Sequence, residues 1–148
     1  MESRYKAAAI IFYRYKYVSG LKRTILQVYL QYEKKFKSWS HFGGKREVFD
    51  RDSFATAFRE LVEEKSCSDT LLCYLHDNIL PKKYFFASKM MVYYVHISPK
   101  NTEFIEANWF AIDWLPSNIR SHIIEQIEEI KTVDLVRYFS NCNISTTI

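Results

Sequence analysis

The chain has 148 residues, of which 48% are hydrophobic and 26% charged, so it fits one folded domain and excludes intrinsic disorder. With only 3 glycines and 3 prolines, it is not a linker or a low-complexity segment. The net charge of +4 is uneven, because residues 1–51 hold 12 Lys and Arg against 4 Asp and Glu. A basic first third beside an acidic remainder favours an anionic ligand held together with a cation.

Neither a membrane segment nor a secretion signal is expected. No apolar run reaches the roughly 20 residues of a membrane helix, and the N-terminus lacks a small-residue cleavage pattern. The cysteines Cys67, Cys73 and Cys142 are odd in number and form no CxxC pair, so we expect no disulfide partner and no cysteine zinc site. An intracellular protein of the cytoplasm or nucleus is therefore expected, and the richness in Lys, Tyr, Phe and Ile also suits a viral protein in a host cell.

The first third of the chain predicts strands and turns. Apolar residues at 6–18 predict a strand, and the alternation at 24–32 predicts its hairpin partner. Residues 33–37 predict a charged loop, followed by a short strand at 39–42. At 43–44 two glycines follow, where we expect a turn or a close backbone approach.

A helix is predicted next, capped by Asp52 or Ser53 and ending near Lys65. Apolar residues at helical spacing predict its buried stripe: Phe54, Ala57, Phe58, Leu61 and Val62. The helix therefore presents one face to a core and leaves another for polar side chains.

The second half predicts more strands and a final helix. Strands are expected at 70–76, at 83–97 as one strand or a hairpin pair, and at 109–112. From Asn118 onward an amphipathic helix is expected, with these residues on its apolar face: Ile119, Ile123, Ile127, Ile130 and Leu135. The order predicts a mixed α/β (α+β) sandwich, one domain over 1–148 with a frayed tail at 141–148.

Three acidic residues of the predicted helix share one face. Glu60, Glu63 and Glu64 stand at i, i+3 and i+4. Such a trio is either an ordinary solvated face or a set of oxygen ligands for a hard divalent cation. Spacing alone leaves both interpretations open.

The segment from Gly44 to Cys67 resembles the Nudix box, G-x5-E-x7-R-E-U-x-E-E-x-G-U with U a bulky apolar residue. The matching residues are Gly44, Arg59, Glu60, Leu61, Glu63 and Glu64, with Cys67 at the final apolar position. Residues 103–116 also resemble the family's E-x-x-E-x-x-W-F strand and the LP turn after it. The resemblance implies a Nudix α/β/α sandwich with a mixed sheet, a box helix after a Gly-rich loop, and a C-terminal amphipathic helix.

The box departs from the family pattern at two places. Fourteen residues, one more than in the family, separate Gly44 from Arg59, so the family's first Glu has no clean match. We expect Asp50 or Asp52 to take its structural role of pairing with Arg59. Ser66 replaces the last Gly, whose left-handed conformation would cost a serine roughly 1 kcal/mol.

The resemblance implies a hydrolase that uses one to three Mg²⁺ or Mn²⁺ ions to cleave a phosphoanhydride bond. The implied ligands, the last two through a main-chain carbonyl, are Glu60, Glu63, Glu64, Gly44 and Gly43. The proton acceptor is Glu60, Glu103 or Glu106, and the family pattern leaves the choice open.

A nucleotide-containing substrate is implied. Lys45 and Arg46 are candidates for phosphate contacts, and Trp39, His41 and Phe42 for the base or cap. The basic first third and the longer loop favour an RNA 5′ end or mRNA cap, hence decapping. The alternatives are a small nucleotide (NTP, NDP, dinucleoside polyphosphate or ADP-ribose) or a non-catalytic RNA-binding module. Homodimerisation stays open.

Overall fold

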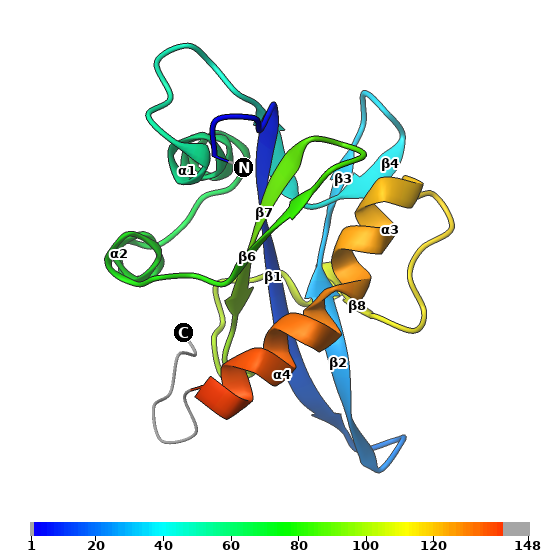
Figure 1. The fold of residues 1–148 in the computed structure, drawn as a ribbon. Helices are drawn as coiled ribbons and strands as arrows, with labels where there is room; N and C mark the ends of the chain where they lie inside the picture. The colour runs from blue at the N-terminus through cyan, green and yellow to red at the C-terminus, as the bar shows by residue number, and fades with distance from the viewer. Residues whose placement is uncertain (1, 141–148) are drawn as a thin grey trace.

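A computed structural model describes residues 2–140 and shows a twisted mixed sheet with two helices on each side (Figure 1). The strands of the main sheet are β1 (Ala7–Val18), β2 (Arg23–Tyr29), β5 (Phe42–Lys45), β6 (Lys82–Phe85), β7 (Met90–His96) and β8 (Trp109–Ala111). Their order is β6-β7-β1-β2-β8, and β5 also pairs with β1. Two short strands, β3 (Gln31–Glu33) and β4 (Ser38–Ser40), form a separate antiparallel pair.

Strand β1 lies at the centre because it is apolar on both sides. Residues 8–14 are all buried, as expected for a strand with a packed layer on each face. It pairs in parallel with β7 and antiparallel with β2 and β5. Alternate side chains enter opposite cores, with Ile10 and Phe12 on one face and Ile11 and Tyr13 on the other.

Helices α1 (Ser53–Glu64) and α2 (Asp69–Asp77) cover one face, and α3 (Ser121–Glu128) and α4 (Ile130–Ser140) cover the other. A one-turn 3₁₀ helix, η1 (Glu106–Asn108), leads into β8. The side chain of Asp52 caps α1 by accepting from the Ala55 N–H at 2.8 Å. The first strand, the α1 boundaries and the β6–β7 hairpin confirm the sequence predictions.

The predicted hairpin partner of the first strand is confirmed as β2, but its end differs from the prediction, and the strand predicted at 70–76 is wrong. The strand at 24–32 is interrupted at Leu30, whose N–H bonds the Asn108 carbonyl at 3.0 Å, so that β3 leaves the main sheet. The segment at 70–76 is helix α2, because Ser68 caps it and Leu71 and Leu75, one turn apart, are fully buried. The apolar run at 70–76 is too short to distinguish the 3.6-residue period of a helix from the two-residue period of a strand.

Gly43 and Gly44 do not form a turn or a Gly-rich loop. They lie within β5, opposite Ala9 and Ala8 of β1. A Cβ at Gly43 would come within 2.5 Å of the Ala9 Cβ and 2.6 Å of the Ala8 carbonyl oxygen. The alternative expectation, a close backbone approach, is the correct one, and the segment between β5 and α1 is the loop at 46–52.

Three further details differ from the expectations. Val62 is 50% exposed and does not belong to the buried stripe of α1. The C-terminal helix is divided into α3 and α4, and Leu135 is 56% exposed. Helix α1 ends with an extended Lys65 (φ −142°), and Ser66 is not among the described residues with positive φ, so the expected strain at that serine is absent.

No helix within residues 2–140 is long and apolar enough to cross a lipid bilayer. Cys67 and Cys73 are free thiols. Cys142 and the tail at 141–148, for which fraying is predicted, lie outside the described residues.

Candidate active site

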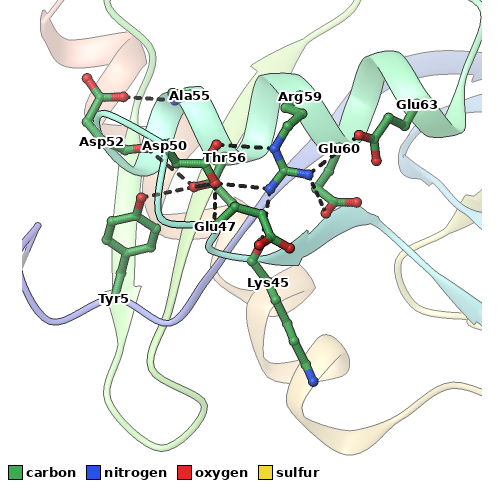
Figure 2. A network of polar contacts seen from close by, with 10 residues as sticks. All are labelled: Tyr5, Lys45, Glu47, Asp50, Asp52, Ala55, Thr56, Arg59, Glu60 and Glu63. Carbon is green, nitrogen blue, oxygen red and sulfur yellow. Dashed lines mark hydrogen bonds and ion pairs between the residues drawn. The ribbon is translucent and has the colours of Figure 1, made fainter.

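Asp50 is the buried anchor of the loop before α1 (Figure 2). Its carboxylate accepts from Arg59 Nε at 3.1 Å and Nη2 at 3.0 Å, from Thr56 Oγ1 at 2.8 Å and from the Glu47 N–H at 2.8 Å. The Arg59 guanidinium, aided by the other donors, holds the pKa of Asp50 well below its usual range. Asp50 therefore pairs with Arg59, whereas Asp52 serves as the helix cap.

Arg59 joins this loop to the acidic face of α1. Its Nη2 also donates to the Lys45 carbonyl at 3.0 Å, which fixes the end of β5. Its Nη1 donates to Glu60 Oε1 at 3.1 Å and lies 3.5 Å from Glu63 Oε1. One guanidinium thus orients the loop, the strand end and two carboxylates, as Figure 2 shows.

Glu60 lies against β5, which we call the glycine strand because it contains Gly43 and Gly44. A Cβ on Gly44 would collide with the Glu60 carboxylate, so only glycine leaves room for this acid. Burial raises the pKa of Glu60, the positive charge of Arg59 opposes that shift, and the charge of Glu63 adds to it. The carboxylate is thus held close to β5 while its negative charge is only partly compensated.

Glu64, the last residue of α1, is more strongly perturbed. Its Oε1 accepts from the Gly43 N–H at 3.0 Å and its Oε2 from Gln31 Nε2 at 2.8 Å. Burial raises its pKa to about 7, against the pull of these two neutral donors, and the charge of Glu60 raises it further. Glu64 is therefore a half-buried carboxylate without a cationic partner among its hydrogen-bond donors.

Glu60, Glu63 and Glu64 are the expected metal ligands of α1. Within residues 2–140, no three His, Cys, Asp or Glu side chains are gathered closely enough to hold an ion. Glu60 and Glu64, one turn apart, both face the glycine strand and both have raised pKa values, while Glu63 is 58% exposed and leans toward Arg59. A set of oxygen donors whose negative charge is only partly compensated fits a hard divalent cation. Two of the three expected acids are in place for one.

The later acidic residues are engaged elsewhere. Glu103 accepts from the Ser68 N–H at 3.1 Å and Oγ at 2.8 Å, at the start of α2. Glu106 pairs with Arg14 at 2.5 Å and Lys16 at 2.6 Å, and these cations lower its pKa to about 2. A carboxylate stabilised in this way is a weak base, which favours Glu60 over Glu106 as a proton acceptor.

The aromatic candidates belong to the interior. His41 is buried, its Nε2 lies 2.7 Å from Gln126 Oε1, and burial lowers its pKa to about 4. Phe42 is 2% exposed and stacks on Tyr29, and Trp39 packs edge-on against a neighbouring ring. Burial removes His41 and Phe42 from the expected substrate contacts, and half-buried Trp39 is committed to packing.

The two basic candidates lie on different sides of β5. The Lys45 side chain is exposed and extends away from Arg59 in Figure 2, so only its carbonyl takes part in the network. Arg46 is exposed and places its guanidinium 4.4 Å from the ring centroid of Tyr5. Tyr5 in turn lies 2.9 Å from Thr56 Oγ1, which connects Arg46 to the Asp50 cluster.

Three residues of the site were missed from the sequence. Thr56 stands one turn before Arg59, a spacing that would have placed both on one face. Gln31 reaches Glu64 only because β3 leaves the main sheet at Leu30, and Tyr5 reaches Thr56 from the start of the chain. No local pattern signals these two long-range contacts.

No protein-family model matches the chain, and no curated protein does. Solved structures do resemble it. A mutT/nudix family protein from Listeria innocua aligns with TM-score 0.58 and 14% identity over 95% of this chain and 99% of that one. A NUDIX family hydrolase from Clostridium perfringens (TM-score 0.48, 19% identity, 90% and 98% covered) and the C. elegans Ap4A hydrolase (0.47, 16%, 95% and 98%) are weaker matches. The chain therefore has the Nudix fold.

Proposed function

We propose that this chain is a divalent-metal-dependent pyrophosphohydrolase that cleaves a phosphoanhydride bond in a nucleotide-containing substrate. The observation that carries the proposal is Glu64, a half-buried carboxylate with raised pKa beside Glu60 and the glycine strand. Two such acids are costly to keep together unless a cation arrives. The Nudix fold of the Listeria innocua protein supports the same class of activity.

Glu60, Glu63, Glu64 and a main-chain carbonyl of Gly43 or Gly44 would hold Mg²⁺ or Mn²⁺. When bound, the ion supplies neutralisation of phosphate charge and a more acidic water. Arg59 acts through Glu60 and Glu63, because its guanidinium contacts both carboxylates and is itself fixed by Asp50. It is a positioning residue.

Glu60 is the proposed proton acceptor. Its pKa is raised by burial, and its position against Gly44 leaves the carboxylate little freedom to turn away. A base of raised pKa takes a proton at neutral pH more readily than the ion-paired Glu106 does.

Among substrates, an RNA 5′ end or cap is proposed first, because residues 1–51, with 12 Lys and Arg against 4 Asp and Glu, are strongly basic whereas the remainder is acidic. Small nucleotides fit the carboxylate site equally well. A non-catalytic binding module is disfavoured, because Glu60, Glu63 and Glu64 are all present.

The test is incubation of the full chain with Mg²⁺ or Mn²⁺ and a substrate panel, with EDTA as the control. The panel contains capped RNA, 5′-triphosphorylated RNA, a dinucleoside polyphosphate, an NTP, an NDP and ADP-ribose. Cleavage of a phosphoanhydride bond that stops in EDTA is expected. If capped RNA stays intact while a free nucleotide is consumed, the RNA preference is wrong. If nothing is consumed and millimolar metal does not bind, the hydrolase proposal is wrong.

A further inference from the structure

A cavity of about 680 Å³ lies where the start of β1, the end of β5 and the β6–β7 turn meet. Its lining holds four cationic residues, Arg4, Lys6, Arg46 and Lys89, together with the rings of Tyr84 and Phe86, and no acidic residue. We call it the N-terminal pocket. Its volume is within the roughly 300–1,000 Å³ typical of ligand sites.

The N-terminal pocket gathers four cationic side chains that have no counter-charge among residues 2–140. In the described part of the chain, none of them forms an ion pair, whereas Lys82 and Lys83 of adjacent β6 pair with Glu2 and Glu129. Like charges gathered in a concave surface raise the local positive potential and attract phosphates. The distribution of ion pairs therefore points to an anionic ligand.

The rings add a second kind of contact. Phe86 is 68% exposed, although a phenyl ring in water is unfavourable, and Tyr84 supports it edge-on at 5.1 Å. The Arg46 guanidinium lies over the Tyr5 ring at 4.4 Å. Nucleic-acid bases stack on exposed aromatic rings and on arginine planes. A ligand with both phosphates and flat bases uses all of these groups.

Backbone hydrogen bonds hold the three segments together. The Lys6 N–H donates to the Lys89 carbonyl at 2.8 Å, and the Arg46 N–H donates to the Lys6 carbonyl at 3.0 Å. Lys89 adopts a positive φ of 53°, which fixes its direction in the turn. The pocket is thus built before a ligand arrives, which lowers the entropy cost of binding.

We propose that the N-terminal pocket binds a short segment of single-stranded nucleic acid, with phosphates against Arg4, Lys6 and Lys89 and a base on Phe86. Arg46 follows Gly44 by two residues, about 7 Å along the strand, so such a segment would lie next to the carboxylate site. Its use in selecting a chain-like substrate rests on the proposed function. Binding itself does not.

The test measures anisotropy of a labelled six-nucleotide RNA, and of DNA with the same sequence, with the full chain in EDTA. Phe86→Ala should weaken binding about fivefold or more, as loss of a stacking ring does. Lys89→Glu should weaken it and reduce the salt slope of log Kd by at least about 0.7. Tyr17→Ala and Lys22→Glu are matched controls at the far end of β1, since Tyr17 is 60% exposed and Lys22 has the same φ of 53°.

Controls within about twofold of the unchanged chain would support the proposal, and so would equal binding of RNA and DNA, which share phosphates and bases. Equal weakening by both pairs of variants would overturn it, as would a poly-glutamate peptide that binds as tightly with the same sensitivity. RNA binding in this pocket, with no hydrolysis on the panel and no binding of millimolar metal, would contradict the proposed function alone. Hydrolysis with RNA binding that ignores Phe86 and Lys89 would sink this inference alone.

Discussion

The two ends of α1 treat a carboxylate in opposite ways. At the start, Asp50 accepts from a guanidinium and two further donors, and its pKa falls well below the usual range. At the end, Glu64 accepts from two neutral donors, and its pKa rises to about 7. The first acid already has its cation, so it stabilises the fold. The second lacks one, which is the property expected of a metal ligand.

The largest expected effect is on turnover. Glu64→Gln should lower hydrolysis at least about a hundredfold, because it removes one anionic metal ligand. The amide oxygen can still accept from the Gly43 N–H, but the amide NH2 cannot accept from Gln31 Nε2, so one hydrogen bond is lost and the melting temperature should fall by only about 2–4 °C. Glu128→Gln, at an exposed position of α3, is the matched control. Rates and melting temperatures decide, and a rate within a few-fold of the unchanged chain would remove Glu64 from the site.

The free energy of unfolding should respond to a substitution of Asp50, just before the start of α1. Asp50→Asn leaves Arg59 without its main counter-charge, and breaking such a pair costs about 3 kcal/mol of unfolding free energy. Asp52→Asn is the control, because asparagine caps a helix about as well as aspartate. Urea unfolding measures both variants. Equal losses would contradict the special role of the Asp50–Arg59 pair.

The smallest expected effect is the pH dependence of metal binding. Below its pKa of about 7, Glu64 carries a proton that Mn²⁺ or Mg²⁺ must displace. Affinity should therefore rise about tenfold per pH unit up to pH 7 and level off above it. Asp50 is ionised throughout this range and adds nothing. Calorimetric titrations at several pH values measure the slope, and the same slope in Glu64→Gln would assign the proton to another group.

The contacts that were predictable from the sequence are local ones. Asp52 as cap, the extent of α1 and an acidic partner for Arg59 all follow from spacings within one segment. Gln31 and Glu64 are 33 residues apart, and their hydrogen bond depends on where a strand breaks. Such contacts are set by tertiary packing, which single-sequence patterns do not encode.

The burial of individual aromatic rings was the second property that could not be predicted from the sequence. A chain with 11 Tyr and 11 Phe offers many rings that a base could stack on, and residue type alone does not separate core from surface. Phe42, beside the glycines, is interior, whereas Phe86, in a distant hairpin, is exposed. Proximity to the box in sequence was therefore a poor guide to which rings are exposed.

The adjacent glycines of β5 exclude a methyl group for unrelated reasons. At Gly43 the obstacle is the backbone and side chain of β1, and at Gly44 it is the carboxylate of Glu60. In a saturation mutagenesis library selected for activity, the loss of variants at position 43 would report on failure of the chain to fold. Depletion at position 44 would report on the pose of one acid in an otherwise intact molecule. Substitutions at two adjacent positions thus report separately on folding and on the proposed catalytic carboxylate.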